Sequence, residues 1–269
     1  AIDAMRRRGG VDPEVLAACR PFVTGDEGVL RREAALLGLE LPFHVAEPDA
    51  SEIPYREGHV NVIRSSRLDL ASIRHGEVDA SSGDAAFQAV RTVIELAMDD
   101  RLDATVTAPI HKESINLAGH RYAGHTEIYA DLTGTDHVAM LLADGDFRVI
   151  QVTTHVSLRR ACDLITEDRV LRVIELLHGA CLQFGEDSPR LAVCGLNPHA
   201  SDGGLFGDEE ERHIIPAIRA AQQKGILAEG PFAADTIMSK VAGGFYAGVV
   251  AMYHDQGHIP FKLKGFVWD

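Results

Sequence analysis

Short apolar segments rich in β-branched residues alternate along this chain with segments whose apolar residues recur every three or four positions. This alternation is typical of βα units and favours an α/β fold over an all-β fold. The expected strands are 20–24, 41–46, 103–108, 137–142, 147–154, 190–196 and 247–253. The expected helices are 84–98, 126–132, 157–165, 209–223, 235–241 and a long helix that follows Thr166, with no helix after the last strand.

The helix after Thr166 has the clearest signals. Its apolar residues are spaced at helical intervals, acidic residues occupy its first turn, and Gly185 follows its end. The polar stretch 47–58 is expected to form a surface loop.

Charge and composition exclude several classes of protein. The 40 acidic and 26 basic residues give a formal charge of −14, which argues against a general nucleic-acid partner. No apolar run has the length of a membrane span, and no signal peptide opens the chain. The four cysteines are scattered, which indicates a reducing cytoplasm rather than a disulfide framework. An anionic substrate would need local positive charge, such as a metal ion.

Three histidines occupy matching positions, because His155, His199 and His254 each follow an expected strand. The carboxyl ends of parallel strands form the ligand-binding edge of open α/β sheets. Three imidazoles there could bind one divalent cation and leave coordination positions open for a substrate. The alternative is that each histidine only caps a strand or bonds to a loop. Lys262, eight residues after His254, could contact a substrate phosphate or be a solvated surface lysine.

A second group of polar residues follows the expected strand 103–108. Lys112 lies at an expected helix start, where free backbone N–H groups could meet an anion. His125 and Thr126 lie at another expected helix start, and Thr126 could instead be only an N-cap. His111 and His120 are weaker candidates. The chain has no GxGxxG after a strand, and no GxxxxGK[ST], GxSxG or HExxH motif.

Several long motifs resemble the 4-hydroxythreonine-4-phosphate dehydrogenase (PdxA) family. They are TAPIHKESINLAGHRYAGHTE, VTTHVSLRRACD, CGLNPHASDGGLFG, GPFAADT and AMYHDQGHIPFK. The resemblance implies two α/β/α domains with a cleft between them, as in isocitrate and isopropylmalate dehydrogenases. Residues 1–124 with 251–269 would form the first domain, incomplete at both ends, and residues 125–250 the second, with metal ligands and dimer contacts.

The same resemblance implies roles for individual residues. His155, His199 and His254 match three metal ligands that are shared between the subunits of a homodimer, and Zn is the preferred ion, with Mg, Mn or Co as alternatives. By the same resemblance, His125, Thr126 and Lys262 match substrate-binding positions of the family. Lys112 and Asp235 match positions with a catalytic role.

The implied activity is NAD-dependent oxidation, with decarboxylation, of a phosphorylated hydroxy acid such as 4-phosphothreonate or 4-hydroxythreonine 4-phosphate. His258, in HDQGHIPFK, favours the 4-phosphothreonate branch over the pyridoxine-pathway enzymes, which tend to read HDQGLP. Alternatives are an aromatic cis-dihydrodiol carboxylate dehydrogenase of the same family, a metal-dependent lyase or hydrolase without NAD, and a non-catalytic ligand-binding protein.

The resemblance also implies segments that this sequence lacks. The family has a GDPxGIGPE segment, which is not present ahead of Ala1, and it continues beyond Gly265–Phe266 with an asparagine, an arginine and much of the NAD site. These differences are the pattern expected of a fragment.

Overall fold

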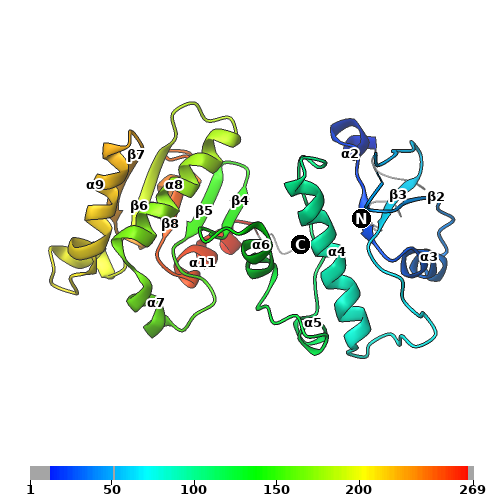
Figure 1. The fold of residues 1–269 in the computed structure, drawn as a ribbon. Coiled ribbons are helices and arrows are strands. Elements are labelled where there is room, and N and C mark those ends of the chain that lie inside the picture. The colour runs from blue at the N-terminus through cyan, green and yellow to red at the C-terminus, as the bar shows by residue number, and fades with distance from the viewer. Residues whose placement is uncertain (1–12, 51, 266–269) are drawn as a thin grey trace. The chain divides into compact units, whose positions relative to one another are not determined.

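Two β-sheets, each flanked by helices, organise the chain in the computed structural model, which describes residues 13–50 and 52–265 (Figure 1). The sheets belong to two compact units, Ala1–Asp136 and His137–Asp269. Three strands form the first sheet and five the second, and all pairings are parallel except one. The predicted α/β class is therefore confirmed.

The first unit contains a parallel sheet of order β1-β3-β2. Its elements are α2 (Pro13–Ala18), β1 (Val23–Gly25), α3 (Glu27–Leu36), β2 (Phe43–Ala46), β3 (Val60–Arg64), α4 (Ala80–Met98), α5 (Lys112–Leu117) and α6 (His125–Thr133). The long helix α4 begins where the carboxylate of Asp79 accepts a hydrogen bond from the backbone N–H of Ser82 at 2.7 Å. Its buried residues Phe87, Val90 and Ile94 pack with Ile115 of α5 and Ile128 of α6.

The second unit contains a sheet of order β4-β5-β8-β6-β7, in which only β4 and β5 are antiparallel. Its strands are β4 (Leu141–Asp144), β5 (Phe147–Gln151), β6 (Arg190–Cys194), β7 (Leu227–Phe232) and β8 (Gly248–Ala251). Its helical elements are α7 (Leu158–Leu164), α8 (Glu167–Gln183), η1 (Pro198–Asp202), η2 (Glu210–Ile214), α9 (Ile215–Gln223), α10 (Ala234–Ala242) and α11 (His254–Gly265).

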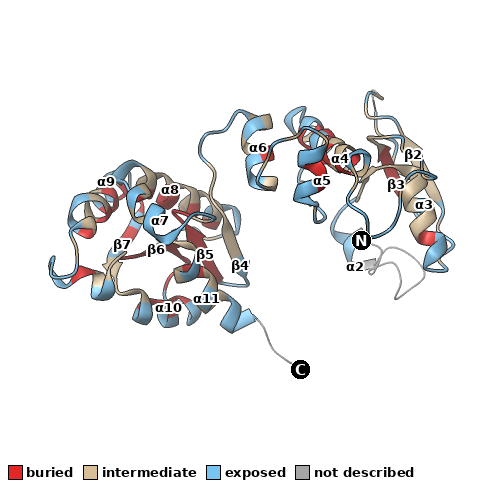
Figure 2. Ribbon diagram, turned by 90° about the horizontal axis from the view of Figure 1, so that it is seen from below, coloured by how far each residue is buried: buried red, intermediate tan, exposed pale blue. Residues whose placement is uncertain are grey.

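Both faces of this second sheet are covered, α8 and α9 on one side and α10 and α11 on the other (Figure 2). Successive residues of a strand point to opposite faces. Ile150 of β5 therefore packs under α8 and α9, whereas its neighbour Val149 packs with α10 and α11. A strand buried on both faces has no polar alternation. The central strand β8 accordingly is a continuous apolar run, GVVA. The predicted helix after Thr166 is confirmed as α8, with the Thr166 hydroxyl accepting from the N–H of Arg169.

Several local expectations differ from the structure. Helices α2 and α3 were not expected, and the expected strand 137–142 overlaps β4 (Leu141–Asp144) only at its end. The expected strand 103–108 belongs to neither sheet, and Val106 is 94% exposed, since no described strand pairs with it. The sequence analysis missed β3 and β7. An internal Gly230–Pro231 step in β7 resembles a turn, but a proline is tolerated in an edge strand. It also missed α11, whose internal Pro260 disfavours a helix.

The compact units also differ from the expected domain boundaries. The implied first domain includes residues 251–269, but Ala251 ends β8 at the centre of the second sheet. Helix α11 then packs on β5 and β8 of that sheet. Residues 125–136, expected in the second domain, lie in the first unit, where α6 packs on α4.

Candidate active site

Two of the three candidate metal ligands lie next to each other beyond the ends of β5 and β8. The register pairs Gln151 with Ala251, and the backbone bonding continues as Thr153 N–H donates to Met252 O at 3.2 Å. Because β5 and β8 are parallel and pair in this register, His155 and His254 both lie at the carboxyl edge of the sheet. Their ring centroids are 5.8 Å apart, with an angle of 45° between the ring planes.

The imidazole of His254 has a defined orientation. His254 is the first residue of α11, and its Nδ1–H donates to Oδ1 of Asp255 at 2.7 Å. In a neutral ring this bond places the lone pair on Nε2, the nitrogen that faces away from Asp255. A carboxylate on the far ring nitrogen is the usual second partner of a metal-binding histidine, because it fixes the tautomer and the ring orientation.

His199 lies in a strained loop after β6. Its φ of 52° is followed by three further left-handed residues, Ala200, Ser201 and Asp202. Each such residue costs on the order of 1–3 kcal/mol, so surrounding contacts must hold the loop in this conformation. Strain of this kind is frequent at functional sites, and the Nδ1 of His199 is 3.1 Å from Oδ2 of Asp202, the same arrangement as at His254.

Glu210 provides the main anchor of this loop. Its carboxylate is 2% exposed, and Oε1 accepts from the backbone N–H groups of Leu196 and Asn197, both at 2.7 Å. The other oxygen accepts from the Asn197 side-chain amide at 2.8 Å. The same amide bonds to Glu209 and thereby lowers the pKa of that carboxyl below its usual range. The sequence analysis did not identify Glu210 as part of the site.

The three histidines do not assemble into one group within the chain. Among residues 13–50 and 52–265, no cluster of three or more His, Cys, Asp or Glu side chains is arranged to hold a metal ion. His199 instead stands near Phe206, with the ring centroids 6.3 Å apart. The η1 loop turns immediately after Pro198, so the position of His199 does not follow from the strand register.

The paired histidines fit a divalent cation. Two imidazole nitrogens bound to one ion at about 2.0–2.1 Å place their ring centroids roughly 5–6 Å apart, which matches the separation of His155 and His254. The free Nε2 of His254 is a suitable neutral nitrogen donor. The described part of one chain thus offers two adjacent donors, and a third protein ligand must come from elsewhere to complete a three-histidine site.

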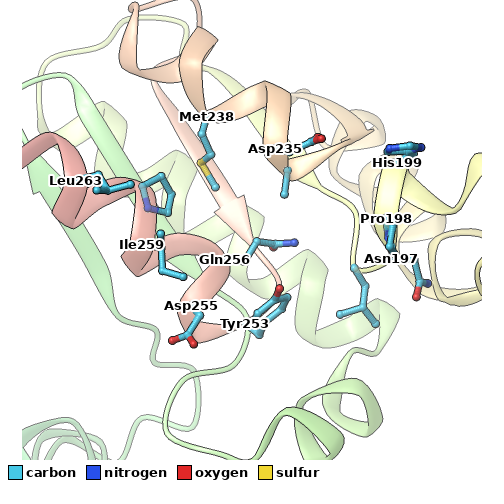
Figure 3. A pocket seen from close by; sticks show the side chains of 13 residues that line it. Asn197, Pro198, His199, Asp235, Met238, Tyr253, Asp255, Gln256, Ile259 and Leu263 are labelled. Atoms are coloured by element: carbon cyan, nitrogen blue, oxygen red, sulfur yellow. The ribbon is translucent and has the colours of Figure 1, made fainter.

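A pocket of about 530 Å³ lies beside these residues, between the loop after β6 and the helices α10 and α11 (Figure 3). Polar residues from these elements and from the segment between β8 and α11 line it, namely Asn197, His199, Asp235, Tyr253, Asp255 and Gln256. Asp235 is exposed and lies in the first turn of α10, where the helix dipole favours a carboxylate. Ile259 and Leu263 give the pocket an apolar side.

Gln256 connects the two loops of this edge. Its Oε1 accepts from the backbone N–H of Met252 at 2.6 Å, and its Nε2 donates to the carbonyl oxygen of Gly195 at 2.8 Å. The segment that carries His254 is therefore tied to the segment that leads to His199. In the sequence, Gln256 and Gly257 are equally compatible with an ordinary turn, so only the structure reveals this role.

Two lysines near the end of α11 differ in their surroundings. Lys262 is exposed and follows His254 by eight residues, which is about 12 Å along a helix. The ammonium of Lys264 instead lies 5.0 Å from the ring centroid of Phe147, a cation–π contact. Lys264 therefore has an aromatic partner in the sheet, whereas the exposed Lys262 is available to a ligand.

The remaining candidates lie in the first unit. Lys112 is the exposed first residue of α5, a helix capped by His111, whose Nδ1 accepts from the N–H of Ser114 at 3.3 Å. His125 and Thr126 open α6 after its N-cap, Gly124, so Thr126 is not the capping residue. The Nε2 of His125 is buried and has no hydrogen-bond partner among the described residues.

His120 has a structural role in this unit. Its Nε2 bonds to Asp84 at 2.8 Å, and its ring stacks on Phe87 with the centroids 3.8 Å apart. The imidazole holds the pKa of the Asp84 carboxyl below its usual range, with a further contribution from Gln88. His120 and His111 thus both have structural partners, and neither needs a catalytic explanation.

Histidines beyond the carboxyl ends of parallel strands lie where α/β proteins of the open-sheet class bind small ligands. The comparisons identify the family, because residues 17–267 match the family model described as pyridoxal phosphate biosynthetic protein PdxA. The chain belongs to this family. The described helices include none with the length and apolarity that a membrane crossing requires.

Similar proteins bear two kinds of dehydrogenase name. A protein of Oceanobacillus iheyensis, whose name proposes D-threonate 4-phosphate dehydrogenase activity, is 42% identical over 95% of this chain and 80% of its own length. The 4-hydroxythreonine-4-phosphate dehydrogenase of Geobacter metallireducens is 42% identical over 95% of this chain and 75% of its own. The crystal structure of 4-hydroxythreonine-4-phosphate dehydrogenase from Klebsiella pneumoniae aligns with a TM-score of 0.82 and 40% identity, covering 96% of this chain and 82% of that one.

Proposed function

We propose that this chain is an NAD-dependent, divalent-metal-dependent dehydrogenase that oxidises a phosphorylated hydroxy acid such as D-threonate 4-phosphate or 4-hydroxythreonine 4-phosphate. The observation that carries the proposal is the pair of imidazoles, His155 and His254, presented side by side at the carboxyl edge of the second sheet. The names of the relatives support the reaction class.

The proposed cation site consists of His155, His199 and His254. His155 and His254, which are adjacent in the chain's structure, would come from one subunit. His199 would come from the other subunit of a homodimer. This sharing explains why the described part of a single chain lacks a group of three donors. Zn is the preferred ion because all three donors are imidazoles, and Mg, Mn or Co are alternatives.

The residues of the chain have distinct proposed tasks. The exposed ammonium of Lys262 would neutralise part of the substrate phosphate charge, as a point charge on a flexible stem. His125 and Thr126 would bind the substrate from the start of α6, where backbone N–H groups also point outward. Asp235 would orient a polar group of the substrate at the mouth of the pocket.

Proton transfer requires a base near the reacting hydroxyl. Lys112 and His125 are the candidates, and the buried Nε2 of His125 has no hydrogen-bond partner among the described residues to compete for a substrate proton. A cation held by His155, His254 and His199 would supply positive charge beside the substrate oxygen, and NAD would supply the hydride acceptor.

The substrate proposal favours a phosphorylated aliphatic acid over an aromatic dihydrodiol. A terephthalate 1,2-cis-dihydrodiol dehydrogenase from Burkholderia xenovorans aligns with a TM-score of 0.67 and 27% identity. The 4-hydroxythreonine-4-phosphate dehydrogenase structure from Burkholderia phymatum aligns with a TM-score of 0.84 and 42% identity. His258 favours D-threonate 4-phosphate within the first group. A cytoplasmic location is proposed with this activity.

The test is the appearance of NADH absorbance when the full-length protein is mixed with NAD, Zn²⁺ or Mg²⁺, and each candidate substrate. The proposal expects turnover of D-threonate 4-phosphate that stops with a chelator and resumes with added cation. The variant His199→Ala should lower kcat/KM by about 100-fold or more, whereas His178→Ala, on α8, serves as the matched control. Turnover that survives both chelation and His199→Ala would exclude the metal site, and product formation without NAD would favour a lyase or hydrolase.

A further inference from the structure

We propose that His258 is a positioning residue that holds the imidazole of His254 in place to bind the divalent cation, and that buried Gln151 anchors it. The inference rests on the proposed function, since it assigns His254 to a cation site. It concerns two residues, His258 and Gln151, that are not themselves proposed as ligands.

The first observation is a close stack of two rings. His254 and His258 lie one turn apart on α11, so their side chains share a face of the helix. Their ring centroids are 3.7 Å apart, and the planes differ by 11°. His258 therefore restricts the ring of His254 from its face, while Asp255 restricts it through Nδ1. Two contacts of different direction leave the ring little rotational freedom.

The second observation is a polar anchor beneath His258. Gln151 is 0% exposed, although it lies on β5 next to apolar neighbours such as Val149. Its Nε2 donates to the Nδ1 of His258 at 2.8 Å. Burying an amide costs free energy unless it is hydrogen-bonded. The Oε1 of Gln151 is buried without a partner among the described residues, so the contact of Nε2 with His258 offsets only part of this cost. The same Nδ1 lies 3.2 Å from the backbone carbonyl oxygen of His254, so the ring of His258 has polar neighbours on both the strand and its own helix.

The third observation is that the first turn of α11 packs closely against β5. A Cβ atom at Gly257 would lie 2.9 Å from both the Nε2 of Gln151 and a methyl carbon of Val149. The helix therefore presses directly on the strand where Gln151 stands, and Gln256 ties the same turn to Met252 and Gly195. A side chain held by such a turn can pre-organise its neighbour, which is how partners beyond the ligands tune a metal site.

Two variants of the full-length protein separate the stacking of His258 on His254 from the contact of His258 with Gln151. His258→Asn keeps an acceptor near the position of Nδ1 but removes the ring, and His258→Phe keeps a ring but removes the acceptor. Affinity for Co²⁺ is measured from its visible absorption, and affinity for Zn²⁺ by calorimetry, beside thermal unfolding. His178→Asn, on α8, is the matched control.

We expect His258→Asn to weaken Co²⁺ binding about 10–100-fold, the range found when partners of metal ligands are removed. His258→Phe should weaken it less, and His178→Asn should leave it unchanged. Should one variant fail to fold, the other still measures its own contribution. Wild-type affinity in His258→Asn, with cation binding intact in the wild type, would overturn the inference alone. A wild type that binds no cation and forms no NADH would overturn the proposed function, and this inference with it.

Discussion

Thr153 and Met252 make a double contact at the end of the β5–β8 pairing. The backbone N–H of Thr153 donates to the carbonyl oxygen of Met252 at 3.2 Å, and the Thr153 hydroxyl donates to the same oxygen at 2.9 Å. Both residues are almost fully buried. Each lies two positions before a histidine of the site. This contact therefore helps to fix the strand register that places His155 beside His254.

Replacing Thr153 with valine keeps the shape of the side chain and removes the hydroxyl. We expect the free energy of unfolding to fall by about 1 kcal/mol, because one buried hydrogen bond is lost. Urea denaturation of the variant and the wild type measures the difference. Thr154→Val, at a less buried position, should change stability by less than about 0.5 kcal/mol. Equal effects at the two positions would contradict a special role for the Thr153 hydroxyl.

Glu210 should be a larger contributor, because its removal leaves two backbone N–H groups without an acceptor and takes one of two carboxylate acceptors from the Asn197 amide. We expect Glu210→Ala to lower the free energy of unfolding by roughly 3 kcal/mol. The loop that carries His199 should also lose its order, so cation affinity should fall with stability. Glu211→Ala, at an exposed neighbouring position, is the control. The role is wrong if both variants unfold at the same urea concentration.

Lys262 and Lys264 offer a matched pair on one helix. Lys262→Met should raise the KM for a phosphorylated substrate about 10-fold or more with a smaller change in kcat, because a charge-assisted contact with the phosphate is lost. Lys264→Met should leave KM unchanged and lower stability by about 0.5–1 kcal/mol, because it removes the contact with Phe147. Steady-state kinetics and thermal unfolding distinguish the two. A higher KM in Lys264→Met together with an unchanged KM in Lys262→Met would contradict the proposed roles.

Two helical glycines should respond oppositely to alanine. A Cβ at Gly83 would lie 2.1 Å from the backbone oxygen of Ser114, so Gly83→Ala must push α5 away from α4. We expect a loss of about 1–3 kcal/mol. Gly179 has open space around its Cβ position in the middle of α8, so Gly179→Ala should raise stability by roughly 0.5–1 kcal/mol. Thermal unfolding of both variants checks the two signs.

Much of the fold was predictable because its signals are local. Capping side chains mark helix starts, as the Thr166 hydroxyl does for α8, and apolar periodicity marks the buried face of that helix. The strand 103–108 was wrong for the opposite reason. Its residues have strand character, but a strand needs a partner, and none of the described residues provides one.

By itself, the sequence determined the order of βα units and the placement of His155, His199 and His254 after strands. Only the tertiary structure decided which of these histidines meet. The pairing of Thr153 with Met252 joins residues 99 positions apart, and it brings His155 to His254. The left-handed loop held by Glu210 takes His199 elsewhere. Periodicity reports the burial of each residue along its own element, whereas neighbours across a parallel sheet are set by long-range pairing, which leaves no local trace.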